Sequence, residues 1–142
     1  MTPQQVKLVQ DSFNKVAPIA DTAADLFYDR LFAIAPQVRP LFPENLAEQK
    51  KKLMQMLATA VTNLHQVEKI IPAVQSLGRH HAGYGVTDAH YQPVGAALLW
   101  TLEKGLGAAF TPEVKTAWTE TYVTLADVMK KAAAEGRAKA AT

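Results

Sequence analysis

Residues 70–81, with the sequence IIPAVQSLGRHH, decide how this chain is interpreted. One face of a predicted helix is formed by residues at spacings of four, three and four: Ile70, Val74, Leu77 and His81. His80 lies about 100° further round this helix, so we expect it near the rim or in solvent. A histidine on an apolar helical face can offer iron an axial ligand, but such a residue is more often an ordinary part of a core.

The composition excludes several kinds of site. The 142 residues include no cysteine, which excludes disulfides, zinc–thiolate sites, iron–sulfur clusters and thiol catalysis. The 15 basic and 13 acidic residues are scattered along the chain and give a net charge of +2. The one dense basic run, residues 50–52, is short and has no interleaved aromatic residues. The sequence therefore predicts no nucleic-acid binding.

The length is sufficient for one domain with a buried cofactor. We expect this domain over residues 1–134 and a flexible tail over residues 135–142. The chain from Lys130 onward consists mainly of alanine, lysine and small polar residues, with one glycine. The sequence contains no signal-peptide pattern at its start and no run of about 20 apolar residues. These features predict a soluble, cytoplasmic protein without membrane insertion.

Helical periodicity dominates the chain, and strand alternation is nearly absent. We expect six helices, over residues 2–17, 21–35, 46–64, 72–81, 88–106 and 111–129. Asp88 is the expected cap of the fifth helix, and Thr111 followed by Pro112 is a strong start for the sixth. Three prolines within residues 36–43 predict a corner that presents Leu41 and Phe42. Periodicity alone leaves a plain bundle and a layered all-α fold both open.

Two polar residues occupy apolar faces of these predicted helices. Tyr28 lies on the apolar stripe of the second helix, and Gln49 lies near the start of the stripe on the third. The residues alone leave other roles open: Tyr28 can be an ordinary residue of the core, and Gln49 can be exposed to solvent. Lys52, three residues after Gln49, is on the same side of the third helix and is long enough to reach a carboxylate at a pocket mouth.

The order and spacing of these motifs resemble the globin family, in particular bacterial single-domain globins, the haem domain of flavohaemoglobins and neuroglobin. Residues 41–42 after Pro36 look like the corner whose phenylalanine stacks on haem. Residues 77–81 look like the helix that supplies the proximal histidine. The resemblance implies a three-over-three helical sandwich that holds haem b, with His81 as the iron ligand and Phe42 packed on the haem.

The resemblance also implies a distal pocket formed by Tyr28, Gln49 and Leu53. Donors at this place stabilise the partial negative charge of bound oxygen, so it implies tight, reversible oxygen binding, with carbon monoxide and nitric oxide as further ligands. The remaining expected contacts of the cofactor are Lys52, Leu77, Val86 and Tyr91.

Two departures from the flavohaemoglobin pattern limit the enzymatic expectation. Tyr91 matches the tyrosine that supports the proximal histidine, but the accompanying glutamate is replaced by Ala133, with Glu135 two residues later. The sequence also contains no glycine-rich dinucleotide fingerprint. Nitric oxide dioxygenation would therefore depend on a separate reductase. A haem-based gas sensor, or a ligand-coupled interaction module, is the alternative function.

Overall fold

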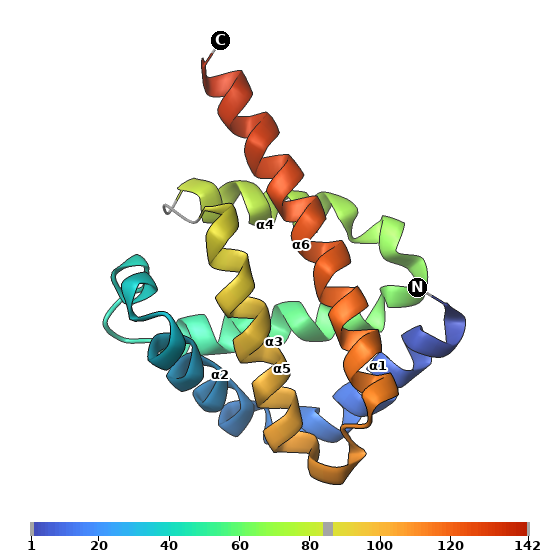
Figure 1. The fold of residues 1–142 in the computed structure, drawn as a ribbon. Helices are drawn as coiled ribbons and strands as arrows, with labels where there is room; N and C mark the ends of the chain where they lie inside the picture. Colours follow the sequence, from blue (N-terminus) through green and yellow to red (C-terminus); the bar gives the residue numbers. More distant parts are fainter. Residues whose placement is uncertain (1, 84–86, 142) are drawn as a thin grey trace.

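The structure is a computed structural model that describes residues 2–83 and 87–141. Within these ranges the secondary structure is entirely helical, and the α-helices are α1 (Pro3–Val16), α2 (Ala20–Ile34), α3 (Ala47–Thr62), α4 (Ile71–Gly83), α5 (Tyr91–Leu106) and α6 (Pro112–Ala141). In Figure 1, α5 and α6 run along the front of the molecule, and α3 and α4 cross behind them. The prediction of an all-α fold is confirmed.

The predicted helix starts depend on local capping. Thr2 accepts a hydrogen bond from the backbone N–H of Gln5, while the Gln5 side chain accepts one from Thr2, so a capping box begins α1. The hydroxyl of Thr111 accepts the backbone N–H of Val114 at 3.2 Å and begins α6. Both starts agree with the sequence prediction.

The expectation that Asp88 caps the fifth helix is wrong. Thr87 is the cap: its side chain accepts the backbone N–H of His90, and its own N–H donates to Nδ1 of His90 at 3.0 Å. This reciprocal pair first produces a 3₁₀ turn, Asp88–His90, and the α-helix begins one residue later. The side chain of Thr87 accepts one of these bonds and its backbone N–H donates the other, so Asp88 becomes the first residue of the turn.

The segments between the helices are more helical than the sequence predicted. The proline-rich corner is a 3₁₀ helix, Pro36–Leu41, and the connection before α4 is another, Leu64–Lys69. Helix α6 continues through residues 135–141, where the sequence suggested a tail. The flexibility of that segment stays a prediction.

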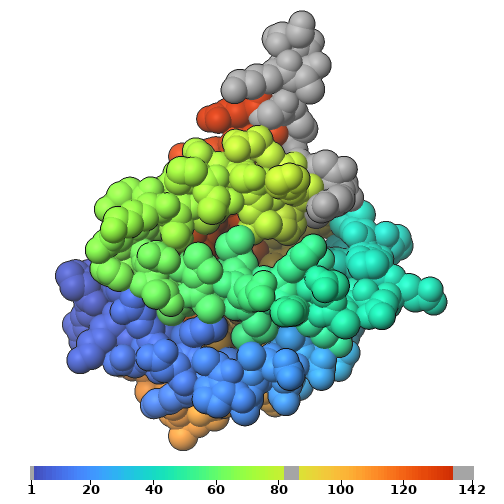
Figure 2. All heavy atoms as spheres, turned by 180° about the vertical axis from the view of Figure 1, so that it is seen from behind, coloured from blue at the N-terminus to red at the C-terminus, as the bar shows by residue number. Residues whose placement is uncertain are grey.

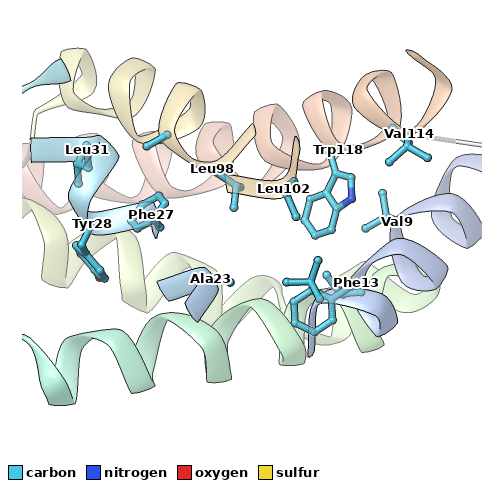
Figure 3. Packing of buried hydrophobic residues seen from close by; sticks show 14 of the residues in the cluster. Val9, Phe13, Ala23, Phe27, Tyr28, Leu31, Leu98, Leu102, Val114 and Trp118 are labelled. Atoms are coloured by element: carbon cyan, nitrogen blue, oxygen red, sulfur yellow. The ribbon is translucent and has the colours of Figure 1, made fainter. Parts of the chain in front are cut away.

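The buried apolar residues form two separate clusters in the described part of the chain. The larger cluster joins α1, α2, α3, α5 and α6, and Figure 3 shows its row of side chains from Tyr28 at one end to Val9 and Val114 at the other. The smaller cluster consists of Ala60, Ile70 and Val74, with side chains of α6 packed against it. Helix α4, which bears the histidine pair, therefore packs mainly on α6.

Candidate functional site

His81 is held in one orientation by its own helix. Its side chain is half-buried, and its Nδ1 atom lies 2.7 Å from the backbone carbonyl oxygen of Leu77. A carbonyl oxygen only accepts hydrogen bonds, so Nδ1 carries the proton and donates it. The lone pair of the neutral imidazole is therefore on Nε2, the atom that a metal ion would use.

His80 differs from His81 in the way the helical spacing predicted. It is exposed, and its Nδ1 atom lies 3.5 Å from the hydroxyl of Ser76 on the outer side of α4. Of the two histidines, His81 is the one that faces the interior.

A glycine allows α4 to lie against α6 at close range. A Cβ atom added to Gly78 would lie 2.6 Å from the Cα of Met129, closer than real Cβ contacts. The contact involves backbone atoms, which cannot rotate away as a side chain can. Gly78, three residues before His81, thus sets the distance of the histidine helix from α6, a role that the sequence analysis did not detect.

Tyr28 is the polar residue in the aromatic part of the core. It is 3% exposed, and its ring makes edge contacts with Phe27 at 4.9 Å and with Phe42 at 5.6 Å between ring centroids. Burial raises the pKa of the Tyr28 hydroxyl from 10.0 to about 12, because the charged phenolate would lose its hydration. Tyr28 therefore keeps its proton at neutral pH.

Gln49 is the hydrogen-bond partner of Tyr28. A side-chain hydrogen bond from Gln49 opposes part of the rise in the pKa of Tyr28, as a bond donated to the phenolic oxygen does. With its oxygen accepting from the amide, the tyrosine can direct its own O–H elsewhere. The structure thus brings together the two polar residues that the sequence placed on separate helices.

Phe42 lies at the end of the proline-rich corner, and an arginine holds that corner in shape. The guanidinium of Arg39 donates to the backbone carbonyls of Phe42, Pro43 and Glu44 at 3.3, 3.0 and 3.1 Å, and it lies over the ring of Phe32 at 5.0 Å. Phe42 also packs against the ring of Phe32 at 5.5 Å. Arg39 could not be recognised from the sequence, because its partners are backbone atoms that leave no pattern of side-chain types.

The other expected contacts of a cofactor are distributed around these residues. Leu53 and Leu77 are half-buried, Lys52 is exposed, and Tyr91 is buried. The carbonyl of Tyr91 accepts the hydroxyl of Tyr122 at 2.6 Å, and burial together with Tyr91 raises the pKa of Tyr122. Val86 lies outside the described residues.

Helices α3 and α4 leave a hollow between them. In the described part of the chain, α3 and α4 do not pack closely along their length; Ala60, near the end of α3, shares the smaller apolar cluster with Val74 of α4. Figure 2 shows the surface hollowed between the green band of α3 and the yellow-green band of α4. Leu53 of α3 and Leu77 of α4 are both half-buried. The donor set is therefore one imidazole nitrogen, one phenol and one amide beside apolar walls, which suits a flat, largely apolar group carrying a metal ion.

Comparison with known proteins identifies the class. The sequence model of the Globin family matches residues 25–129, most of the chain, so the chain belongs to the globin family. In the described ranges, no helix is both long and apolar enough to cross a membrane.

Particular relatives narrow the comparison. The chain is 32% identical over 127 residues to the flavohemoprotein of Bacillus subtilis strain 168, which covers 86% of this chain and 31% of the relative. It is 29% identical over 131 residues to the flavohemoprotein of Rhodopirellula baltica, covering 90% of this chain and 32% of the relative. The chain thus spans about a third of the length of these proteins.

Two solved structures share the fold. A bacterial globin from Campylobacter jejuni aligns with a TM-score of 0.84 and 23% identity, over 94% of this chain and 97% of the other. An engineered carbene transferase, derived from a candidate nitric oxide dioxygenase of Rhodothermus marinus, aligns with a TM-score of 0.91 and 25% identity, over 100% and 99% of the two chains. The expected globin fold is confirmed.

Proposed function

We propose that this chain binds haem b through His81 and holds oxygen tightly and reversibly on the side of Tyr28 and Gln49. The observation that carries the proposal is the hydrogen bond from Nδ1 of His81 to Leu77, which leaves Nε2 as a neutral ligand atom on the inner side of α4. Membership of the globin family and the similarity to flavohemoproteins support a haem as the metal-bearing group.

The residues present fit such a group. Phe42, Leu53 and Leu77 would form apolar walls, and Lys52 is exposed, where its ammonium group could pair with a propionate carboxylate. When bound, haem would supply an iron that His81 would ligate and that can bind a diatomic gas. We expect Val86 and Tyr91 to complete the surroundings.

The distal residues would determine how long oxygen stays. Gln49 donates to the oxygen of Tyr28, and the raised pKa of Tyr28 keeps its O–H intact at neutral pH. That O–H is available to donate to a ligand that gains negative charge. A hydrogen bond to a charged group contributes about 1.5–3 kcal/mol, which is enough to slow release by roughly ten- to a hundredfold.

An enzymatic role follows if an electron donor is present. Nitric oxide, dioxygen and one electron together give nitrate, so each turnover needs one electron from outside the pocket. We propose that a separate reductase supplies it, in line with the names of the flavohemoprotein relatives and of the Rhodothermus marinus protein. Tyr28 and Gln49 would hold the oxygen in place while nitric oxide arrives.

Reversible oxygen binding is tested by adding oxygen to the purified protein and removing it again. The purified protein is loaded with haem, reduced, exposed to oxygen and then degassed, while its visible spectrum is recorded. We expect a spectrum that changes on oxygen addition and returns on its removal over several cycles. Immediate oxidation to the ferric form at the first exposure would refute reversible oxygen binding.

A further inference from the structure

An ion pair links α2 to α3 at the level of Tyr28 and Gln49. Nζ of Lys50 on α3 lies 2.8 Å from Oδ1 of Asp25 on α2. Asp25 precedes Tyr28 by three residues, so their side chains are neighbours on the surface of α2. Lys50 directly follows Gln49 on α3. The ion pair and the hydrogen bond between Gln49 and Tyr28 therefore join the same two turns of these helices.

The ion pair lies at a groove between α3 and the junction of α1 and α2. The groove has a volume of about 820 Å³, and both Asp25 and Lys50 line it. Figure 2 shows this face, with the blue atoms of α1 and α2 beside the green atoms of α3. Asp21 and Lys51 also line the groove, but among the side chains that the structure describes Asp25 and Lys50 form the only ion pair. The charged connection across the groove therefore depends on these two residues.

The start of α3 has few polar anchors of its own. Leu46 precedes the helix, and its side chain makes no capping hydrogen bond, although it packs against the larger apolar cluster. Oδ1 of Asn45 accepts the backbone N–H of Ala47 at 3.0 Å. Helix ends fray where their N–H groups lack partners, so contacts with α2 determine how firmly the first turn holds Gln49.

We propose that Asp25 and Lys50 are positioning residues, whose ion pair holds the first turn of α3 against α2 and so keeps Gln49 at the hydroxyl of Tyr28. The side chain of Lys50 is 30% exposed and that of Asp25 is 59% exposed, so dissolved ions screen their attraction. An exposed ion pair shifts an equilibrium by no more than about fivefold. The first turn should therefore open more often as the ionic strength rises. The effect on a bound gas rests on the proposed function; the hold on α3 does not.

Hydrogen exchange of backbone amides tests this role of the ion pair in the full chain as purified, with or without haem. The N–H of Lys50 donates to the carbonyl of Leu46 at 2.8 Å, and this bond breaks when the first turn opens. In Asp25→Asn we expect the amides of residues 50–53 to exchange about two- to fivefold faster than in the wild type at low salt. In about 1 M salt the wild type should approach the rate of the variant, because the charges are then screened.

Further variants separate the ion pair from other effects of substitution. Lys51→Met removes a charge from the same groove, and among the described residues no carboxylate pairs with Lys51, so exchange should remain as in the wild type. The charge-reversed double variant, Asp25→Lys with Lys50→Asp, should regain the slow exchange that Asp25→Lys alone loses. Equal exchange in the wild type and Asp25→Asn, or no recovery in the double variant, would overturn the proposal.

The effect on the distal residues is tested in the haem-loaded protein by the infrared stretching band of bound carbon monoxide. A hydrogen-bond donor near the ligand lowers the frequency of this band, so the band reports how closely Tyr28 and Gln49 approach. We expect Asp25→Asn to increase the share of the higher-frequency form, and Lys51→Met to leave it unchanged. Faster amide exchange with an unchanged band would overturn the link from the ion pair to Gln49. If the protein takes up no haem, the proposed function fails, and amide exchange still decides whether the ion pair holds α3.

Discussion

Nδ1 of His81 lies 2.7 Å from the carbonyl oxygen of Leu77, one turn earlier on the same helix. This bond fixes the rotation of the ring and the tautomer together, and a donated Nδ1–H makes Nε2 a more basic ligand. The contact with Leu77 thus orients His81 so that its Nε2 atom is a candidate ligand for iron. On the other side of the proposed haem pocket, a side-chain hydrogen bond joins Gln49 to Tyr28.

Removal of the Tyr28 hydroxyl should accelerate oxygen release. We expect Tyr28→Phe to release oxygen roughly ten- to a hundredfold faster than the wild type, because a donor to a negatively charged ligand is lost. Stopped-flow mixing of the oxygenated protein with carbon monoxide measures this rate. Tyr122→Phe is the control, since the hydroxyl of Tyr122 is engaged by the carbonyl of Tyr91. Equal release rates in the wild type and Tyr28→Phe would show that Tyr28 does not contact the ligand.

The same tyrosine should make stability depend on pH in the alkaline range. Its pKa is 10.0 in an unfolded chain and about 12 in the fold, so its contribution is complete below pH 10 and is lost as the pH rises through 12. Over that interval the unfolding free energy of the wild type should fall by roughly 2–3 kcal/mol more than that of Tyr28→Phe. Urea titrations at several pH values measure both. Parallel curves would contradict the burial of a protonated Tyr28.

Gly78→Ala should separate α4 from α6. We expect it to lower the unfolding free energy by about 1–3 kcal/mol, because the new methyl group would overlap the backbone of Met129. Gly105→Ala is the matched control: its Cβ would lie 3.6 Å from Cδ1 of Ile19, an ordinary contact, so it should stabilise by about 0.5–1 kcal/mol. Denaturant unfolding measures both variants. The same change in both would refute the close approach of α4 to α6.

Arg39→Met should loosen the corner that presents Phe42. The variant removes three charge-assisted bonds to backbone carbonyls, so we expect the haem-loaded protein to lose haem several-fold faster. Transfer of haem to an excess of apomyoglobin measures this rate. Arg30→Met, which removes an arginine stacked on Trp100, is the control. A loss rate as slow as in the control would mean that Arg39 does not support the pocket.

The sequence was sufficient to predict the helices, because apolar periodicity, prolines and cap residues act locally. It also predicted that His81 faces inward and His80 outward, since that distinction depends only on helical phase. Tyr28 and Gln49 were identified as polar residues on apolar faces, but their hydrogen bond depends on how α2 and α3 pack.

The remaining features depend on tertiary contacts that leave no local pattern. Arg39 donates to backbone carbonyls. A glycine is needed at position 78 because the backbone of Met129, 51 positions later in the sequence, lies too close for a Cβ atom. The cap of the fifth helix was misplaced because Thr87 and Asp88 are both good cap residues, and only the geometry of His90 separates them.

The most direct test of the account is the absorption spectrum of the haem-titrated protein in its ferrous and carbon-monoxide-bound forms, recorded for the wild type, His81→Gly and His80→Gly. We expect the wild type and His80→Gly to bind one haem with a histidine-ligated spectrum. His81→Gly should lose that spectrum and regain it on addition of imidazole. A folded wild type that takes up no haem, or a His81→Gly variant with an unchanged spectrum, would contradict it.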